Sequence, residues 1–301
     1  MNWLSRQSFL GKNSSVVLKE AKVGIVGLGG GGSHIAQQLA HVGVGNFLLV
    51  DPDSIEEHNL NRLVGGTVRD VRRKASKVEI ARRVILGVQP HADIKPMACI
   101  WQHAVNELRK CDVIFGCVDS FRERDELERF CRQNLIPYID IGMDVTKVGP
   151  DYLVAGQTLL SMPGQPCLRC VGVITEERLE REAETYGAAG PHAQVIWPNG
   201  VLASLAVGFF MQLLTPWHRK PAIGAYREYD ANSNTVRVSP KWRSLEERKC
   251  PHHPEKDRGD PTFDIRQWLD RQDTSPAGPS LIQKLLEEIR DFWSAVMAGR
   301  R

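Results

Sequence analysis

A run of glycines between a strand-like segment and a helix-like segment constrains the fold of this chain more than any other feature. Residues 22–26 (KVGIV) have the composition of a buried strand, residues 27–32 (GLGGGG) follow directly, and residues 33–41 have helical character. Glycine has no Cβ, so such a loop lets the backbone approach a phosphate at the N-terminus of a helix. The pattern predicts a nucleotide-binding strand–loop–helix unit, with a structural glycine turn as the alternative.

The first half of the chain repeats this alternation of short strands and longer amphipathic stretches, which is the pattern of βαβ units. We therefore expect an α/β fold with a Rossmann-like, doubly wound and mostly parallel sheet, extended by antiparallel strands after residue 142. Helices are expected at 33–41, 74–86 and 125–134, and strands at 22–26, 46–50, 93–96, 113–116, 138–141, 152–160, 226–229 and 235–238.

The last part of the chain differs in composition. Residues 251–279 are polar and rich in proline, and residues 280–297 place apolar side chains at helical spacing. We expect a domain over residues 1–254, a polar linker over 255–279 and an amphipathic helix over 280–301. The apolar stretch 201–214 is predicted to be a buried helix, too short to span a bilayer.

The composition of the chain limits the kinds of binding partner and the cellular compartment that we expect for it. The chain has 39 basic and 36 acidic side chains, a net charge of +3, so it has no broad positive field. The charge balance argues against a nucleic-acid partner, although residues 69–74 (RDVRRK) form a local basic run, and we expect no membrane contact. The N-terminus lacks the apolar core of an export signal, which predicts a cytoplasmic protein.

A carboxylate follows the second expected strand. Asp51 lies where the carboxylate of a nucleotide-binding fold accepts hydrogen bonds from ribose hydroxyls. The glycine loop and Asp51 alone would favour an NAD-dependent dehydrogenase. Asp53, Asn59 and Arg62 follow within a few residues, however, and a dinucleotide enzyme needs no such cluster.

Positive charge and a candidate metal ligand complete the polar set. Arg62 and Lys77 suit a triphosphate whose α-phosphorus is attacked, because negative charge builds on its oxygens. Asp119 and Ser120 follow the fourth expected strand at the ligand-binding edge of the sheet, and Asp119 is a natural Mg²⁺ ligand. Each has a plainer role: Asn59 or Asp119 as a cap, and Arg62 or Lys77 as a solvated cation.

Two pairs of potential metal ligands lie far apart in the chain. Cys167 and Cys170 form a Cys-x-x-Cys pair, and Cys250 is followed by Pro251, His252 and His253. Such spacing lets a short turn present two ligands to tetrahedral zinc, and it favours His253 over His252. Four protein ligands leave no open position, so the zinc would be structural. The alternative is that the second pair is an ordinary polar turn.

The order of these motifs resembles the HesA/MoeB/ThiF superfamily of adenylating enzymes, which includes ubiquitin-activating enzymes and the activators of bacterial sulfur carriers. The resemblance covers residues 1–253 and rests on Gly27-x-Gly29-Gly30-x-Gly32-Ser33, Asp51-x-Asp53, Asn59-Leu-x-Arg62, Lys77-Val-Glu79, Cys117-Val-Asp119-Ser-x-x-x-Arg124 and Pro166-Cys167-x-x-Cys170. It implies an ATP and Mg²⁺ site formed by Gly27, Gly29, Gly30, Gly32, Asp51, Asp53, Asn59, Arg62, Lys77, Asp119 and Ser120.

The resemblance also implies an activity. Family members use ATP to adenylate the C-terminal glycine carboxylate of a ubiquitin-like or sulfur-carrier protein and release pyrophosphate. Ser5-Arg6-Gln7 resembles an element whose arginine reaches the nucleotide of a partner subunit, which implies a homodimer in which Arg6 acts in trans. The family usually has four cysteines at the metal site, so a histidine there is a departure.

The chain lacks a cysteine where many relatives form a thioester. Residues 171–214 contain none, and Cys99, Cys111, Cys117 and Cys131 fall in or beside expected helices and strands, as buried thiols do. We therefore expect direct transfer of the acyl group to a partner's nucleophile, such as a conjugating protein. Residues 187–204 resemble the segment that guides the incoming tail.

Two other functions remain open at this point. One is adenylation of a small molecule or RNA, as in the tRNA threonylcarbamoyl-adenosine dehydratases that resemble this family. The other is a nucleotide-binding scaffold without catalysis, against which the presence of Arg6, Asn59, Arg62, Lys77 and Asp119 argues. The sequence identifies neither the carrier protein nor the final acceptor.

Overall fold

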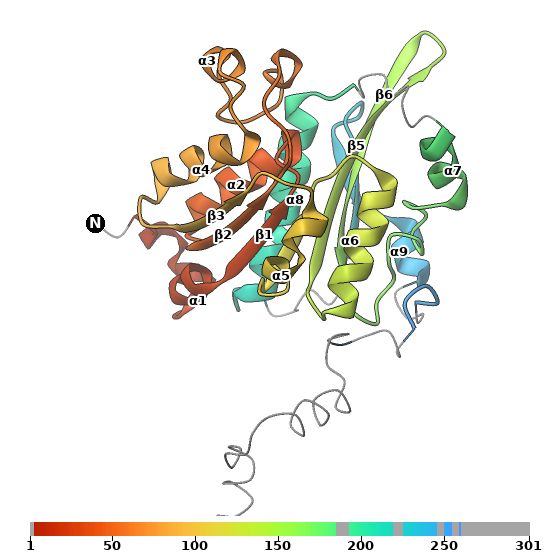
Figure 1. Ribbon diagram of the computed structural model, residues 1–301. Coiled ribbons are helices and arrows are strands. Elements are labelled where there is room, and N and C mark those ends of the chain that lie inside the picture. The colour runs from red at the N-terminus through yellow and green to blue at the C-terminus, as the bar shows by residue number, and fades with distance from the viewer. Residues whose placement is uncertain (1–2, 185–192, 219–224, 246–249, 255–258, 260–301) are drawn as a thin grey trace, which may run out of the picture. The chain divides into compact units, whose positions relative to one another are not determined.

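Eight strands form one mixed sheet with the order β3-β2-β1-β4-β5-β6-β7-β8 (Figure 1). The computed structural model describes residues 3–184, 193–218, 225–245, 250–254 and 259. The strands are β1 (Lys22–Val26), β2 (Asn46–Val50), β3 (Asp93–Met97), β4 (Val113–Gly116), β5 (Tyr138–Val148), β6 (Asp151–Ser161), β7 (Ala225–Asp230) and β8 (Thr235–Val238). The first five are parallel and β5 to β8 are antiparallel, which confirms the predicted fold class.

Helices cover both faces of the sheet. In Figure 1 the yellow helix α6 lies in front of the sheet and the teal helix α8 lies behind it. The helices are α1 (Ser14–Glu20), α2 (Gly30–Val42), α3 (Val68–Arg72), α4 (Lys77–Val88), α5 (Val105–Leu108), α6 (Phe121–Gln133), α7 (Glu176–Glu184), α8 (Ile196–Leu214) and α9 (Pro240–Leu245), with 3-10 turns η1 (Ser5–Leu10), η2 (Glu57–Asn59) and η3 (Trp101–Ala104).

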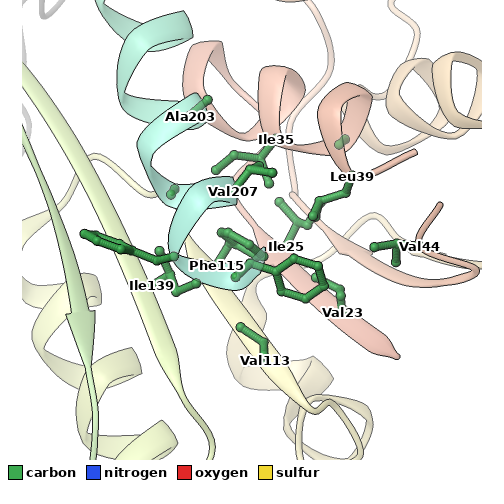
Figure 2. Close-up of a cluster of buried hydrophobic side chains, with 14 of the residues drawn as sticks. Val23, Ile25, Ile35, Leu39, Val44, Val113, Phe115, Ile139, Ala203 and Val207 are labelled. Atoms are coloured by element: carbon green, nitrogen blue, oxygen red, sulfur yellow. The ribbon is translucent and has the colours of Figure 1, made fainter. Parts of the chain in front are cut away.

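The alternation of side chains along each strand divides the core into two parts. In β4, Val113 and Phe115 pack with α2 and α8, whereas Ile114 packs on the opposite face with Leu127 of α6. Figure 2 shows the first cluster, in which Val207 of α8 approaches Ile35 of α2 above the sheet. Because both faces are covered, β1, β2 and β4 are buried along almost their whole length, whereas the edge strand β3 is partly exposed.

Helix α8 is longer than its apolar stretch suggested. It begins at Ile196 and has 19 residues, so by length and composition alone it could cross a membrane. The expectation that this stretch is too short is therefore wrong. Half of its most apolar window is nevertheless buried inside the protein, where it packs against α2, β5 and β6, so the predicted buried helix is confirmed.

Several boundaries differ from the prediction for local reasons. Helix α2 begins at Gly30 because the glycines themselves form its first turn. Helix α6 begins at Phe121 because the Ser120 side chain caps it by accepting a hydrogen bond from the Glu123 amide. Strand β5 extends seven residues beyond Ile141, since it pairs along its whole length with β6. The predicted linker over 255–279 and the helix over 280–301 lie outside the described residues, apart from Gly259.

Candidate active site

A pocket of about 370 Å³ lies at the carboxyl ends of β1, β2 and β4, where open α/β sheets bind ligands. Its volume is in the range of small-molecule sites. Ten residues predicted for the nucleotide site line it: Gly27, Gly29, Gly30, Asp51, Asp53, Asn59, Arg62, Lys77, Asp119 and Ser120.

The glycine loop is required by close backbone packing. Gly27 has a φ of +86°, and a Cβ there would lie 2.5 Å from the carbonyl oxygen of Cys117. A Cβ on Gly32 would lie 1.9 Å from the carbonyl oxygen of Gly27, and Gly32 does not line the pocket. The structure therefore gives Gly32 a packing role behind the loop, whereas Gly29 and Gly30 face the pocket at the N-terminus of α2.

Asp51 is fixed by the backbone of the loop that it faces. Its Oδ2 accepts a hydrogen bond of 2.6 Å from the Leu28 amide, and its Oδ1 accepts one of 2.9 Å from the Asp53 amide. Burial raises the pKa of Asp51, while Lys77 and the two amides act in the opposite direction. The carboxylate is thus held rigidly beside the glycine loop with lone pairs left for a ligand.

Lys77 is not the solvated cation that the sequence left open. Its Nζ lies 2.7 Å from Asp53 Oδ2 and 3.9 Å from Asp51 Oδ1, and only 12% of its side chain is exposed. Helix α4 begins at Lys77, which places its ammonium group over the loop after β2. The pocket therefore contains a fixed positive charge beside the carboxylates of Asp51 and Asp53.

Asn59 and Arg62 have structural partners as well as pocket positions. Asn59 accepts a hydrogen bond from the Glu56 amide, so the alternative role of a turn cap is correct, but the buried side chain also lines the pocket. Arg62 donates from Nη1 to the carbonyl oxygen of His58 and to Oδ1 of Asn61. These bonds hold Arg62 at the pocket wall before any ligand arrives.

Two neighbouring residues in the loop after β4, Asp119 and Ser120, have different roles. Ser120 caps α6, which leaves Asp119 exposed at the pocket instead of capping the helix. Glu123, one turn into α6, also lines the pocket, and burial together with neighbouring carboxylates raises its pKa. The sequence prediction missed Glu123, because a glutamate in the first turn of a helix has a ready explanation in the helix dipole. Asp53, Asp119 and Glu123 all line the pocket, and carboxylate oxygens are the donors that Mg²⁺ takes.

The segment before α8 supplies two further residues that the prediction missed. The Gln194 side chain donates a hydrogen bond of 3.0 Å to Asp119 Oδ1. Asn199 is buried, and a Cβ on Gly30 would lie 2.6 Å from its Nδ2 atom. Only the general resemblance of residues 187–204 to a tail-guiding segment pointed to this part of the chain.

A buried ion pair supports the wall of the pocket. Arg124 of α6 donates from Nε to Asp140 Oδ1 at 3.0 Å, and the Tyr138 hydroxyl donates to the same oxygen. Gly142, which lines the pocket, leaves room for this guanidinium, since a Cβ there would lie 2.8 Å from Arg124 Nη2. Arg124 therefore positions the end of β5 from behind.

Replacing Arg124 should destabilise the domain strongly. Arg124→Ala leaves the fully buried Asp140 without its charged partner, and we expect the free energy of unfolding to fall by about 3–5 kcal/mol. Thermal denaturation measures this loss. The matched control is Arg129→Ala, because Arg129 lies on the same helix but is exposed. An unchanged melting temperature in Arg124→Ala would contradict the structural role of the pair.

Arg6 lies apart from this pocket in its own subunit. It belongs to the 3-10 turn η1, is exposed and does not line the pocket. A role at the nucleotide of the same chain is therefore not supported by its position.

A second site brings together the two predicted ligand pairs. The sulfurs of Cys167 and Cys170 are 3.6 Å apart, as are those of Cys170 and Cys250. Hydrogen bonds from the other two thiols lower the pKa of Cys250, which favours a thiolate there. Three sulfurs and one imidazole nitrogen form a cluster that could hold a metal ion, and this donor set is one that structural tetrahedral zinc takes.

The fourth ligand position differs from the prediction. His252 Nδ1 lies 3.4 Å from the sulfurs of both Cys167 and Cys170, so His252 completes the cluster of four. The choice of His253 is corrected: its Nε2 lies 3.9 Å from Glu128 Oε2, in a second, buried group with Glu128 and Cys167. Adjacent side chains point in different directions, and the turn after Cys250 sends the second histidine inward.

Glu128 anchors the metal-ligand loop to α6. Its carboxylate accepts hydrogen bonds from the Leu168 amide at 3.1 and 3.2 Å and from the Ser161 hydroxyl at 2.5 Å. Arg132 donates to the carbonyl oxygens of Gln165 and Pro166. These bonds fix the backbone that presents Cys167. The sequence prediction missed Glu128, because nothing in the sequence distinguished it from the solvated charged residues of an ordinary helix.

Burial disfavours the thiolate in three of the four remaining cysteines. Burial raises the pKa of Cys111 to about 12 and the pKa values of Cys117 and Cys131 well above the ordinary thiol value. Since the thiolate is the nucleophile, these three are poor acceptors of an acyl group. Cys99 is partly exposed and lines the pocket.

Known proteins share this fold and sequence pattern. The ThiF family model matches residues 4–252. The molybdopterin-synthase adenylyltransferase of Escherichia coli strain K12 is 32% identical over 216 residues, which cover 71% of this chain and 80% of that protein. The sulfur carrier protein ThiS adenylyltransferase of the same strain is 29% identical over 240 residues, covering 78% and 86%. The crystal structure of E. coli MccB with succinimide has a TM-score of 0.64 at 24% identity, covering 79% and 70%, and shows the likeness of fold.

Proposed function

The chain belongs to the ThiF family, and we propose that this adenylyltransferase activates the C-terminal glycine carboxylate of a ubiquitin-like or sulfur-carrier protein with ATP. The reaction joins the carboxylate to AMP and releases pyrophosphate. One observation carries the proposal: Asp51, Arg62, Lys77 and Asp119, from four different segments, converge on one pocket at the N-terminus of α2.

The side chains supply positioning and charge. In the proposed reaction Asp51 holds the ribose and the first turn of α2 faces the phosphates. Arg62 and Lys77 stabilise the negative charge that builds on the α-phosphate when it is attacked. The nucleophile is already a carboxylate, so no side chain has to act as a general base.

Three carboxylates that line the pocket suit a divalent cation. Asp119, with Asp53 and Glu123 nearby on the same pocket, would hold Mg²⁺, which when bound neutralises phosphate charge. Lys77 keeps Asp53 oriented through their contact.

We also propose that the acyl group passes directly to a partner. Residues 171–249 contain no cysteine, and three of the other four thiols outside the metal cluster have raised pKa values; Cys111 and Cys131 are buried and Cys117 is half-buried. The acceptor would be a nucleophile of another protein, such as a conjugating protein.

Intact-mass measurement tests direct transfer. After incubation with ATP, Mg²⁺ and a carrier, we expect less than roughly 5% of the enzyme to carry a thiol-sensitive adduct, because no activated cysteine is available. The control variant is Cys99→Ser, which removes one of the two cysteines that line the pocket, the other being Cys117. A carrier–enzyme adduct in the wild type that disappears in Cys99→Ser would replace direct transfer with a thioester step.

A homodimer is part of the proposal. Apolar side chains are exposed on η1 and beyond α8, where Phe9 and Trp217 meet edge to face with ring centroids 6.4 Å apart. Trp197, 55% exposed, lines a shallow groove between α2 and α8 with His34 and Ser204. In the proposed dimer a second copy would cover exposed apolar side chains of this kind, and the exposed Arg6 of η1 would act at its partner's nucleotide.

Mixing variants tests the action of Arg6 in trans. Arg6→Ala and Asp119→Ala should each be inactive as pure homodimers. Random pairing of equal amounts makes half of the dimers mixed, each with one complete site, so about a quarter of wild-type adenylation should return. Pyrophosphate release from the re-paired mixture measures this recovery, and a mixture that stays inactive although mixed dimers form would exclude the role in trans.

ATP–pyrophosphate exchange with a panel of ubiquitin-fold carriers tests the function as a whole. We expect exchange only with a carrier whose glycine-terminated tail is intact, and none after removal of the last glycine. Exchange that is independent of any carrier but requires a small molecule or tRNA would instead support the dehydratase-like alternative.

A further inference from the structure

Three hydrogen bonds join the loops around the pocket. Arg62 Nη1 donates to Asn61 Oδ1 at 2.9 Å, and Asn61 Nδ2 donates to the carbonyl oxygen of Gln194 at 2.8 Å. Gln194 Nε2 in turn donates to Asp119 Oδ1 at 3.0 Å. We call this chain of bonds the Asn61–Gln194 bridge. It connects the loop after β2, the segment before α8 and the loop after β4.

We propose that the Asn61–Gln194 bridge competes with the metal–nucleotide complex, so that Gln194 restrains Asp119 until nucleotide and cation displace it. The inference rests on the proposed function, because it assigns Asp119 to the cation and Arg62 to the nucleotide. It adds a positioning residue, Gln194, to that site.

The competition follows from the chemistry of the two ends. At one end, the Gln194 amide donates a hydrogen bond to an oxygen of Asp119 that a divalent cation would otherwise bind. A partly positive hydrogen-bond donor next to a cation is electrostatically unfavourable. At the other end, Arg62 points its Nη1 at Asn61 and at the carbonyl oxygen of His58. A phosphate that recruits Arg62 must draw this nitrogen away from one or both.

The bridge is weak enough to be reversible. Asp119 and Asn61 are exposed, and Gln194 is only partly buried. Hydrogen bonds between exposed groups contribute little net free energy, so a divalent cation can displace them. Displacing Gln194 would act near the glycine loop. Asn199, five residues after Gln194 in the sequence, lies against Gly30 of that loop.

The test measures metal-dependent binding of a nucleotide that is not turned over. The full chain is titrated with Mg²⁺ at a fixed concentration of α,β-methylene ATP, and binding is followed by calorimetry. Gln194→Ala should lower the Mg²⁺ concentration at half-saturation about fivefold, because binding no longer breaks the bond to Asp119. Asn61→Ala should shift it in the same direction by releasing the Gln194 carbonyl.

A double variant separates the bridge from unrelated effects. If both residues act through one bridge, Gln194→Ala combined with Asn61→Ala should shift the Mg²⁺ dependence no further than the larger single change. Gln133→Ala, at the far end of α6, is the matched control and should leave the dependence unchanged.

The possible outcomes distinguish this inference from the proposed function. An unchanged or increased Mg²⁺ requirement in Gln194→Ala, or additive effects in the double variant, would overturn the bridge while leaving nucleotide binding intact. A wild-type chain that binds no nucleotide with Mg²⁺ would overturn the proposed function and the bridge together. Thermal unfolding of each variant verifies that the fold is retained.

Discussion

Asp119→Ala should reduce carrier-dependent ATP–pyrophosphate exchange by about a hundredfold to a thousandfold. Asp119 is the exposed carboxylate at the end of β4, and its loss removes the cation ligand that the proposed reaction needs to neutralise the phosphates. Because the side chain is exposed and Ser120 caps the helix, the fold should not depend on it.

The control for this variant is another exposed aspartate. Asp151→Ala, at the start of β6, should retain exchange and melting temperature, and Asp119→Ala should retain its melting temperature. If Asp119→Ala retained more than roughly a tenth of the wild-type exchange rate, the proposed reaction would not depend on this carboxylate.

Loss of a metal ligand should have the largest effect on stability. Cys170→Ser or His252→Ala breaks the cluster of three sulfurs and one nitrogen. Structural zinc contributes about 10–16 kcal/mol of apparent binding free energy in small domains, so losing one of four ligands should remove about 5 kcal/mol. The melting temperature should then fall by about 10–20 °C.

His253→Ala is the internal control for the zinc assignment. His253 faces Glu128 instead of the sulfur cluster, so this variant should still bind about one zinc ion per chain and lose only about 1–2 kcal/mol. Atomic absorption of the purified variants measures the metal content. Zinc lost from His253→Ala and retained by His252→Ala would reverse the assignment.

The parallel half of the fold and the outline of the site could be predicted from the sequence. Strands β1 and β2 are buried apolar runs bounded by polar or glycine residues, so composition alone defines their ends. Asp51 and Asp119 directly follow such strands, and the carboxyl ends of parallel strands meet at one edge. The pocket follows from this topology.

What could not be predicted depends on contacts between distant segments. The full length of β5 requires β6 as its partner, and Gln194 contacts both Asn61 and Asp119, which are distant from it in the sequence. Glu128 resembles the solvated charges around it, yet it is fully buried beneath Leu168. The choice between His252 and His253 depends on the local turn, which ligand spacing does not describe.

The metal cluster also has a consequence for the order in which the domain is completed. Cys167 and Cys170 precede α8, β7 and β8, whereas Cys250 and His252 come after them. During synthesis the first ligand pair emerges long before the second, and closing a loop of this length needs the intervening elements to be docked. Zinc capture would therefore mark the end of folding of this domain, and a chain truncated before Cys250 would lack half of the donors that close it.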